Sequence, residues 1–464
     1  MLATAVVLLP VFAQIPDFAA LHVFAWVWVA GDPAVSAMVM GLLAAGLLCA
    51  GWRVLGPSQR WAWSGSCVVG FLVVVQGARM QSFHGAAGPD WTYPVAVGNA
   101  FLWFVVPFLV WWRQPARLEP LVRTGLGIAG VVVAVFCMLQ YLLVCRGGGL
   151  VNQVWAPAPI DVFGVYPDAV RLSGLANSPN LTAAVLVVCW PALLGRYPRN
   201  GGVRVWTATA LGIFLTTTAM LLTYTRAAYL GLLVQVVVLG LLALRSRERI
   251  VRAWLGRGLV LALVPLLLVS LAFAPVARRF ASLAVPTDQS VGHRLHLYQA
   301  ITQLIMERPI CGWGGGMFGV LYRGFDRIPG VEYGYGDAHS GVLLWLFELG
   351  VAGCFLVVAG VVGWRMRLLL SRVPVWIGVS LLGAIPLLLT DNPTLRLPAL
   401  SVPLLMMLAV LAGLGRVLER RCPPPRRVIT VFVAAVACWM LSALLPPPDP
   451  IRRLEGRLRS EERR

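Results

Sequence analysis

The sequence predicts an all-α integral membrane protein, and three observations support this fold class. Of the 464 residues, 59% are hydrophobic and only 12% are charged, about half the charged fraction that is usual for soluble domains. Apolar runs of roughly 18 residues or more, long enough to cross a bilayer, recur along the whole chain. Arginines gather in alternate short connections between these runs, as the positive-inside rule predicts for cytoplasmic loops.

Twelve apolar runs define the expected membrane spans. They cover residues 34–55, 61–80, 94–112, 121–145, 179–196, 205–223, 226–244, 257–275, 339–364, 374–390, 395–415 and 428–446. The first thirty residues are also apolar, but Pro10, Pro16 and Asp17 interrupt them, so they form one kinked span or two short helices. A thirteenth crossing would place the basic tail at 447–464 outside the cytoplasm. We therefore expect about twelve spans with both ends inside, in a single membrane domain over residues 1–464.

The longest connection, residues 276–338, is predicted to be a large periplasmic loop. Loops of about 60 residues are usually functional or disordered, and the composition of this one is not that of a disordered segment. Within it, residues 293–309 carry apolar side chains at helical spacing and end at Pro309. This pattern predicts a short amphipathic helix on the membrane surface.

Several function classes are excluded by composition and motif. The net charge of +19 comes from arginine alone, because the chain contains no lysine; much of this charge orients the spans and does not indicate nucleic-acid binding. The nine cysteines lie mostly within spans and form no CxxC motif, so no metal site is predicted. A G-x-G-x-x-G match at Gly314, Gly316 and Gly319 follows no strand, which excludes a dinucleotide site. These glycines favour a tight bend or close approach to a ligand, and no cofactor is expected.

Arginines on the external side are the first candidate site residues, because membrane topology does not require them there. Arg226 lies in a short turn between two spans, where a guanidinium is costly unless it is paired or functional; the alternative is that it snorkels to the interface. Arg171 precedes a span that Asn180 could cap, and the alternative is a surface charge. Arg294 is predicted to begin the amphipathic helix, where a cation opposes the helix dipole. An anionic partner would explain that position.

His339 is the candidate general base. It follows Asp337 and immediately precedes a long apolar run. A neutral imidazole can accept a proton near neutral pH, and Asp337 in the same substrate site, or another acidic group, would orient it. Each nearby guanidinium group would bind phosphate through two parallel hydrogen bonds, without a metal. The alternative is that His339 is only an interfacial residue at the start of a helix.

Four segments in this order resemble the O-antigen ligase and polymerase superfamily of bacterial envelope glycosyltransferases. They are "RLSGLANSPN", "YTRAAYLG", "GHRLHLYQAITQLIMERPICGWGGGMF" and "DAHSGVLLWLFELGVAG". The resemblance extends over roughly residues 165–395. It implies an all-helical fold of about twelve spans in the bacterial inner membrane, with a large periplasmic loop. It also implies transfer of a glycan from undecaprenyl pyrophosphate, without nucleotide or metal.

The resemblance also assigns roles to individual residues. The essential histidine of the family corresponds to His339, and its two arginines correspond to Arg226 and Arg294. These two arginines would hold the departing pyrophosphate, and Arg171 would support them as a further substrate-binding residue. The family usually has asparagine after the histidine, where this chain has Ser340. This difference counts against a role for a side-chain amide at that position. Further external arginines would meet either the phosphates of lipid A or anionic headgroups of membrane lipids: Arg278, Arg279, Arg323 and Arg327.

The predicted activity is that of an O-antigen ligase, which joins the glycan to lipid A–core. An O-antigen polymerase would use the same donor with another lipid-linked glycan as acceptor. A flippase or transporter of lipid-linked glycans is the alternative from another class. Such a protein would be expected to show internal repeats or paired broken helices, which the sequence does not suggest.

Overall fold

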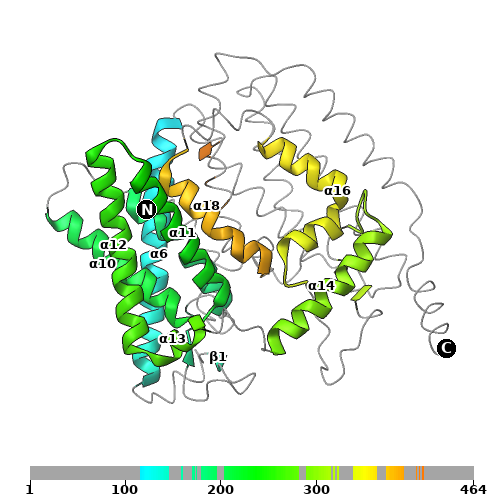
Figure 1. Cartoon of the computed structure of the whole chain (residues 1–464), viewed down its shortest axis with the longest axis horizontal. Coiled ribbons are helices and arrows are strands. Elements are labelled where there is room, and N and C mark those ends of the chain that lie inside the picture. Colours follow the sequence, from blue (N-terminus) through cyan, green and yellow to red (C-terminus); the bar gives the residue numbers. More distant parts are fainter. Residues whose placement is uncertain are drawn as a thin grey trace, which may run out of the picture. The chain divides into compact units, whose positions relative to one another are not determined.

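The computed structural model is predominantly helical (Figure 1). It describes residues 115–145, 158–159, 170–172, 174, 179–195, 203–281, 289–314, 317–318, 321–322, 338–362, 373–390, 404, 407 and 410–411. These residues fall into two compact units, one within 100–289 and 372–414 and the other within 290–371. The structure does not describe the predicted spans before residue 115 or the tail at 447–464. Of the last two predicted spans, it describes only residues 404, 407, 410 and 411.

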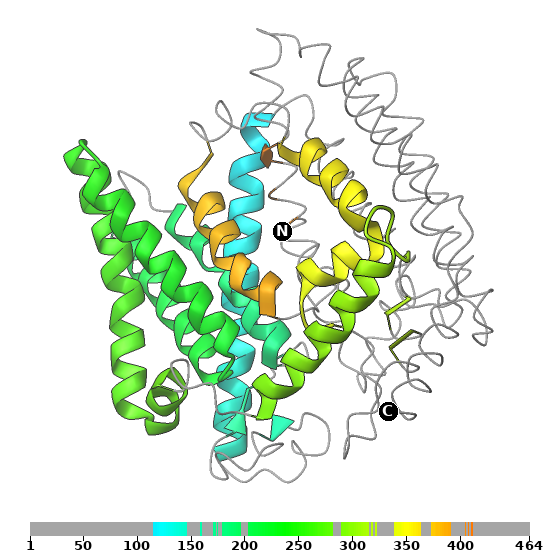
Figure 2. The same ribbon diagram turned by 45° about the vertical axis from the view of Figure 1, so that its right-hand side comes forward.

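The first unit is a bundle of apolar helices. Its helices are α6 (Pro115–Cys145), α8 (Pro179–Cys189), α9 (Pro191–Gly195), α10 (Val203–Leu222), α11 (Arg226–Arg245), α12 (Arg249–Ala272), α13 (Ala274–Ala281) and α18 (Val375–Thr390). Helix α11 packs against α12 and α18, and α10 packs against α6 and α12 (Figure 2). Four helices in the described part are long and apolar enough to cross a membrane: residues Glu119–Leu142, Val203–Leu222, Arg226–Arg245 and Leu255–Ala272.

The expected spans 205–223 and 226–244 are confirmed as helices within two residues at each end. The span at 179–196 differs, because the helix breaks at Trp190 and resumes as α9. Pro191 opens the new helix, a position where its missing N–H and fixed φ are tolerated. The only strands in the described residues are two-residue segments, β1 (Ala158–Pro159) and β2 (Val170–Arg171), which pair antiparallel.

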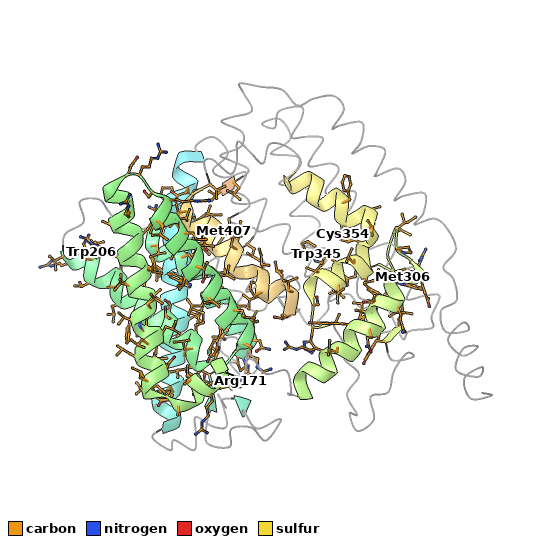
Figure 3. All side chains as sticks on the ribbon, in the orientation of Figure 1. Arg171, Trp206, Met306, Trp345, Cys354 and Met407 are labelled. Atoms are coloured by element: carbon orange, nitrogen blue, oxygen red, sulfur yellow. The ribbon has the colours of Figure 1, made fainter. Side chains whose placement is uncertain are left out.

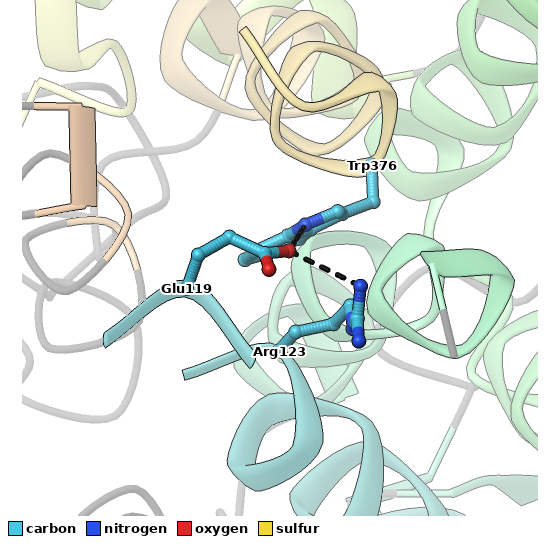
Figure 4. A network of polar contacts seen from close by, with 3 residues as sticks. All are labelled: Glu119, Arg123 and Trp376. Atoms are coloured by element: carbon cyan, nitrogen blue, oxygen red, sulfur yellow. Dashed lines mark hydrogen bonds and ion pairs between the residues drawn. The ribbon is translucent and has the colours of Figure 1, made fainter. Parts of the chain in front are cut away.

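Hydrogen bonds of polar side chains stabilise this bundle at two places. Trp190 Nε1 donates to Gln235 Oε1 (2.6 Å) at the α8–α9 break, and Gln235 Nε2 donates to the Val187 carbonyl (2.8 Å). At the start of α6, Glu119 Oε1 accepts from Trp376 Nε1 of α18 (2.7 Å) and from Arg123 (3.3 Å; Figure 4). Backbone groups at an interrupted apolar helix need internal partners, and Gln235 supplies one of them.

The second unit contains α14 (Gln289–Glu307) and α16 (Gly341–Val362). The expected amphipathic helix is present as α14, and its buried face (Leu297, Ile301 and Leu304) packs into one core with Trp313 and Phe347. Protein therefore covers this face, and the membrane-surface position stays a prediction. Helix α16 is not continuous, because Gly350 has non-helical angles (φ 66°, ψ 178°). The apolar runs predicted at 179–196 and 339–364 are thus each interrupted, at Trp190 and at Gly350, and hydropathy alone could not reveal either break.

Candidate active site

Arg226 is the first residue of α11, and the tight turn before it fixes where that helix begins. Tyr224 in this turn has a left-handed backbone (φ 52°), uncommon for a residue other than glycine. It follows the last residues of α10, and its N–H donates to the Leu221 carbonyl (3.1 Å). The Tyr229 hydroxyl, one turn into α11, donates to the same carbonyl (2.5 Å). The half-buried Arg226 side chain therefore starts from a tightly held turn.

Arg171, labelled in Figure 3, lies against this turn. Its Nε donates to the Thr223 carbonyl (3.0 Å), and its Nη2 donates to Asn180 Oδ1 (2.8 Å) and to Thr225 Oγ1 (3.3 Å). Asn180 was expected to cap α8; it is instead the second residue of that helix and accepts hydrogen bonds from Arg171 and Thr225. The segments "RLSGLANSPN" and "YTRAAYLG" are thus brought together.

Gly174 holds the chain close to α6 just after Arg171. Its φ is 53°, and its N–H donates to Gln140 Oε1 (3.0 Å) in the bundle core. A Cβ at this position would lie 2.7 Å from the sulfur of Cys137, closer than two such atoms can approach. Glycine is required here by both backbone angle and space.

Tyr224 does not qualify as a general base in this unit. Burial, together with the nearby Tyr141 phenol, raises the pKa of Tyr224 to about 12. Its hydroxyl therefore stays protonated near neutral pH and can only act as a hydrogen-bonding group.

His339 lies at the entrance to α16 in the second unit. Like Tyr224, it has a left-handed backbone (φ 47°). The next residue, Ser340, is buried, and its Oγ accepts from the Leu343 N–H (3.4 Å), three residues on. This is the pattern of an N-cap, for which serine is a preferred residue. Ser340 is therefore suited to begin α16 where the family usually has asparagine.

Tyr298 ties α14 to His339. Its hydroxyl donates to the backbone carbonyl of His339 (3.1 Å). Arg294 is half-buried and lies four residues before Tyr298 on α14, so the two side chains project from the same face. This relation brings Arg294 to the side of α14 that contacts the His339 turn. The prediction that Arg294 begins the amphipathic helix was wrong, because α14 begins at Gln289; Arg294 lies beyond the first turn and does not oppose the helix dipole there.

In the described part of the glycine-rich segment after α14, the backbone packs closely against α16; Gly316 and Gly319 lie outside the described residues. At the break in α16, the N–H groups of Val351 and Ala352 donate to the carbonyls of Pro309 (2.7 Å) and Ile310 (3.1 Å). In return, the Trp313 N–H donates to the Phe347 carbonyl (2.8 Å). A Cβ on Gly312 would lie 2.5 Å from the Glu348 carbonyl oxygen. Gly312 therefore allows two backbones to meet, which holds α16 against the end of α14.

The sequence analysis missed several polar residues near these segments. Thr225 and Tyr298 connect to Arg171 and His339 through hydrogen bonds; neither residue type was distinctive in the sequence. Arg308 (6% exposed) and Glu348 (1% exposed) are buried in the second unit. A charged residue within an apolar run was an available signal for Glu348, and the Arg308 guanidinium lies over the Trp313 ring (5.5 Å to its centre).

The structure thus brings Arg171 to the turn before Arg226, and it connects the His339 turn to α14, the helix that carries Arg294, through Tyr298. Three further candidates, Asp337, Arg323 and Arg327, lie outside the described residues. Among the residues that the structure describes, no group of three His, Cys, Asp or Glu side chains could hold a metal ion.

Comparison with known proteins gives a match over residues 211–358 to a family model described as O-antigen ligase. The matched segment is about a third of the chain and contains Arg226, Arg294 and His339. It confirms the superfamily resemblance predicted from the sequence. Arg171 lies before the matched segment. No curated protein matches the chain.

Proposed function

We propose that the chain is an O-antigen ligase, because residues 211–358 match a family model described as O-antigen ligase. The enzyme transfers a glycan from undecaprenyl pyrophosphate to lipid A–core on the periplasmic face of the bacterial inner membrane. The observation that carries this proposal is the family match, whose limits include both the α10–α11 turn and the His339 turn. The apolar helices support a multi-pass membrane enzyme.

In the proposed reaction, His339 is the general base. It removes the proton from an acceptor hydroxyl as that oxygen attacks the anomeric carbon of the donor sugar. The bond from that carbon to the pyrophosphate oxygen breaks, and undecaprenyl pyrophosphate leaves with the bonding electrons. Attack opposite the leaving group inverts the configuration at the anomeric carbon. The Asp337 carboxylate orients the imidazole.

Arg226 and Arg294 hold the departing pyrophosphate in this proposal. Guanidinium groups pair with phosphate oxygens through two parallel hydrogen bonds and keep their charge at any physiological pH. The position of Arg294 on the face of α14 that carries Tyr298, which is bonded to His339, supports its assignment to the same site as the base. Arg323 and Arg327 are assigned to the phosphates of lipid A.

Deletion of the gene separates the ligase from the polymerase, which shares the donor. Loss of a ligase should leave lipid A–core without O-antigen on a gel, while long glycan accumulates on undecaprenyl pyrophosphate. Loss of a polymerase should leave core bearing a single repeat unit, because a separate ligase still transfers it. A core-plus-one band would assign the chain as the polymerase. If the purified protein moved the lipid-linked glycan across a vesicle membrane without transferring it to an acceptor, the chain would be a transporter.

Lysine should replace Arg226 or Arg294 poorly. Arg226→Lys and Arg294→Lys keep the charge but lose the paired hydrogen bonds, worth about 1.5–3 kcal/mol to a charged group. We expect transfer by purified enzyme to fall about 10- to 100-fold in each variant. Arg204→Lys, at an exposed position of α10, is the matched control and should transfer normally.

The same assay in excess chelator should show unchanged transfer, because the arginines replace a metal in binding pyrophosphate. A strict requirement for magnesium or manganese would contradict this role, as would full activity of both lysine variants.

A further inference from the structure

Arg171 connects the start of α8 with the α10–α11 turn, two places that are more than forty residues apart in the sequence. Its guanidinium reaches the Thr223 carbonyl, the Asn180 side chain and the Thr225 hydroxyl, and Thr225 Oγ1 in turn donates to Asn180 Oδ1 (3.2 Å). Thr225 is only 4% exposed. We call these three side chains, Arg171, Asn180 and Thr225, the arginine clamp.

The geometry of the clamp fixes the guanidinium plane. Nε and Nη2 are neighbouring donors on one edge of the arginine fork, and both are directed at the α10–α11 turn. A rigid planar group that is bound along one edge has little freedom to rotate. All three of these acceptors are neutral oxygens, so the hydrogen bonds hold the side chain without cancelling its charge.

The clamp includes the residue directly before Arg226. Thr225 is the N-cap residue of α11, yet its hydroxyl makes no capping hydrogen bond; it is bonded within the clamp instead. The turn is also bound through its backbone, because the Leu172 N–H donates to the Leu222 carbonyl (3.2 Å). The position of the first residue of α11 therefore depends on contacts from the segment that carries Arg171.

We propose that Arg171 is a positioning residue, which acts through Thr225 and Asn180 to hold Arg226 in place for the pyrophosphate leaving group. This inference rests on the proposed function of Arg226. It replaces the simpler assignment of Arg171 as a ligand of the donor. A misplacement of about 1 Å in a catalytic group can lower a rate about 100-fold, so loss of the clamp should be visible in turnover.

The test uses substitutions that leave Arg171 in place. Thr225→Val and Asn180→Ala each remove one acceptor of the clamp, and we expect kcat of the purified enzyme to fall about 10-fold with little change in the KM for the lipid-linked donor. Thr207→Val is the matched control, because the Thr207 hydroxyl lies at an exposed position of α10 and bonds only to the Arg204 carbonyl. It should keep wild-type kcat.

A double-substitution cycle separates positioning from a general loss of stability. If the clamp acts through Arg226, then adding Thr225→Val to Arg226→Lys should lower kcat by less than about 3-fold. A purely structural defect would lower activity by the same factor in both backgrounds and would contradict the proposal. So would normal kcat in Thr225→Val and Asn180→Ala while Arg171→Ala is inactive, which would identify Arg171 as a direct ligand. Full activity of Arg226→Lys alone would instead refute the role proposed for Arg226.

Discussion

Replacing His339 with alanine should lower glycan transfer by about 10²- to 10⁴-fold, the usual contribution of a general base. The reason is that no other group at this turn is proposed to take the proton of the acceptor hydroxyl. The measurement is transfer by purified enzyme from lipid-linked glycan to lipid A–core, with the protein level determined in the same membranes.

The test of His339 as a base needs a second variant, because the backbone of this residue has an unusual conformation. Because its φ is 47°, a change of side chain could also disturb the start of α16. Asparagine tolerates the left-handed conformation better than most residues, and it lacks a basic nitrogen. His339→Asn should therefore fold normally, keep the Tyr298 hydrogen bond to its carbonyl, and still be inactive. Transfer near the wild-type rate in His339→Asn would remove His339 from the mechanism as a base.

Hydropathy predicted the elements whose limits depend on composition alone. Helix α11 was expected at 226–244 and extends over Arg226–Arg245, because an apolar run between two arginines has sharp ends. The break at Gly350 was not predictable in the same way, since "LFELGVAG" remains apolar almost throughout. That break depends on backbone bonds to Pro309 and Ile310, and no local pattern in α16 encodes those partners.

The residues of the candidate site divide in the same way, into those with a local signal in the sequence and those whose contacts are distant in the sequence. His339 and Arg226 were selected because an ionisable residue at the edge of an apolar run is costly and therefore distinctive, whereas Arg294 was selected from a helix start that the structure places five residues earlier. The role of Arg171 was not predictable, because its partners lie 9, 52 and 54 residues away. Tyr298 also gave no signal of its own, since an aromatic residue on an amphipathic helix is ordinarily part of the core.

Gly350→Ala should strongly destabilise the second unit. Its φ of 66° with ψ of 178° is a conformation that only glycine adopts readily. An added Cβ would also overlap the carbonyl of Ile310, which is a backbone group and cannot move aside as a side chain would. Backbone strain and overpacking together should lower the free energy of unfolding by about 3 kcal/mol or more. Thermal unfolding of the detergent-purified protein measures the effect.

Gly240→Ala in α11 and Gly256→Ala in α12 are the matched controls. A Cβ at either position would meet no atom within 4 Å, so alanine should be neutral or should stabilise the helix by up to about 1 kcal/mol. Gly312→Ala, across the contact from Gly350, should reproduce the large loss, because its φ is 67° and its Cβ would lie 2.5 Å from the Glu348 carbonyl oxygen. If Gly350→Ala and Gly312→Ala both unfolded at the temperature of the controls, the close contact between the two backbones would not exist. Because that contact holds α16 against the end of α14, such a result would also contradict the packing of these two helices.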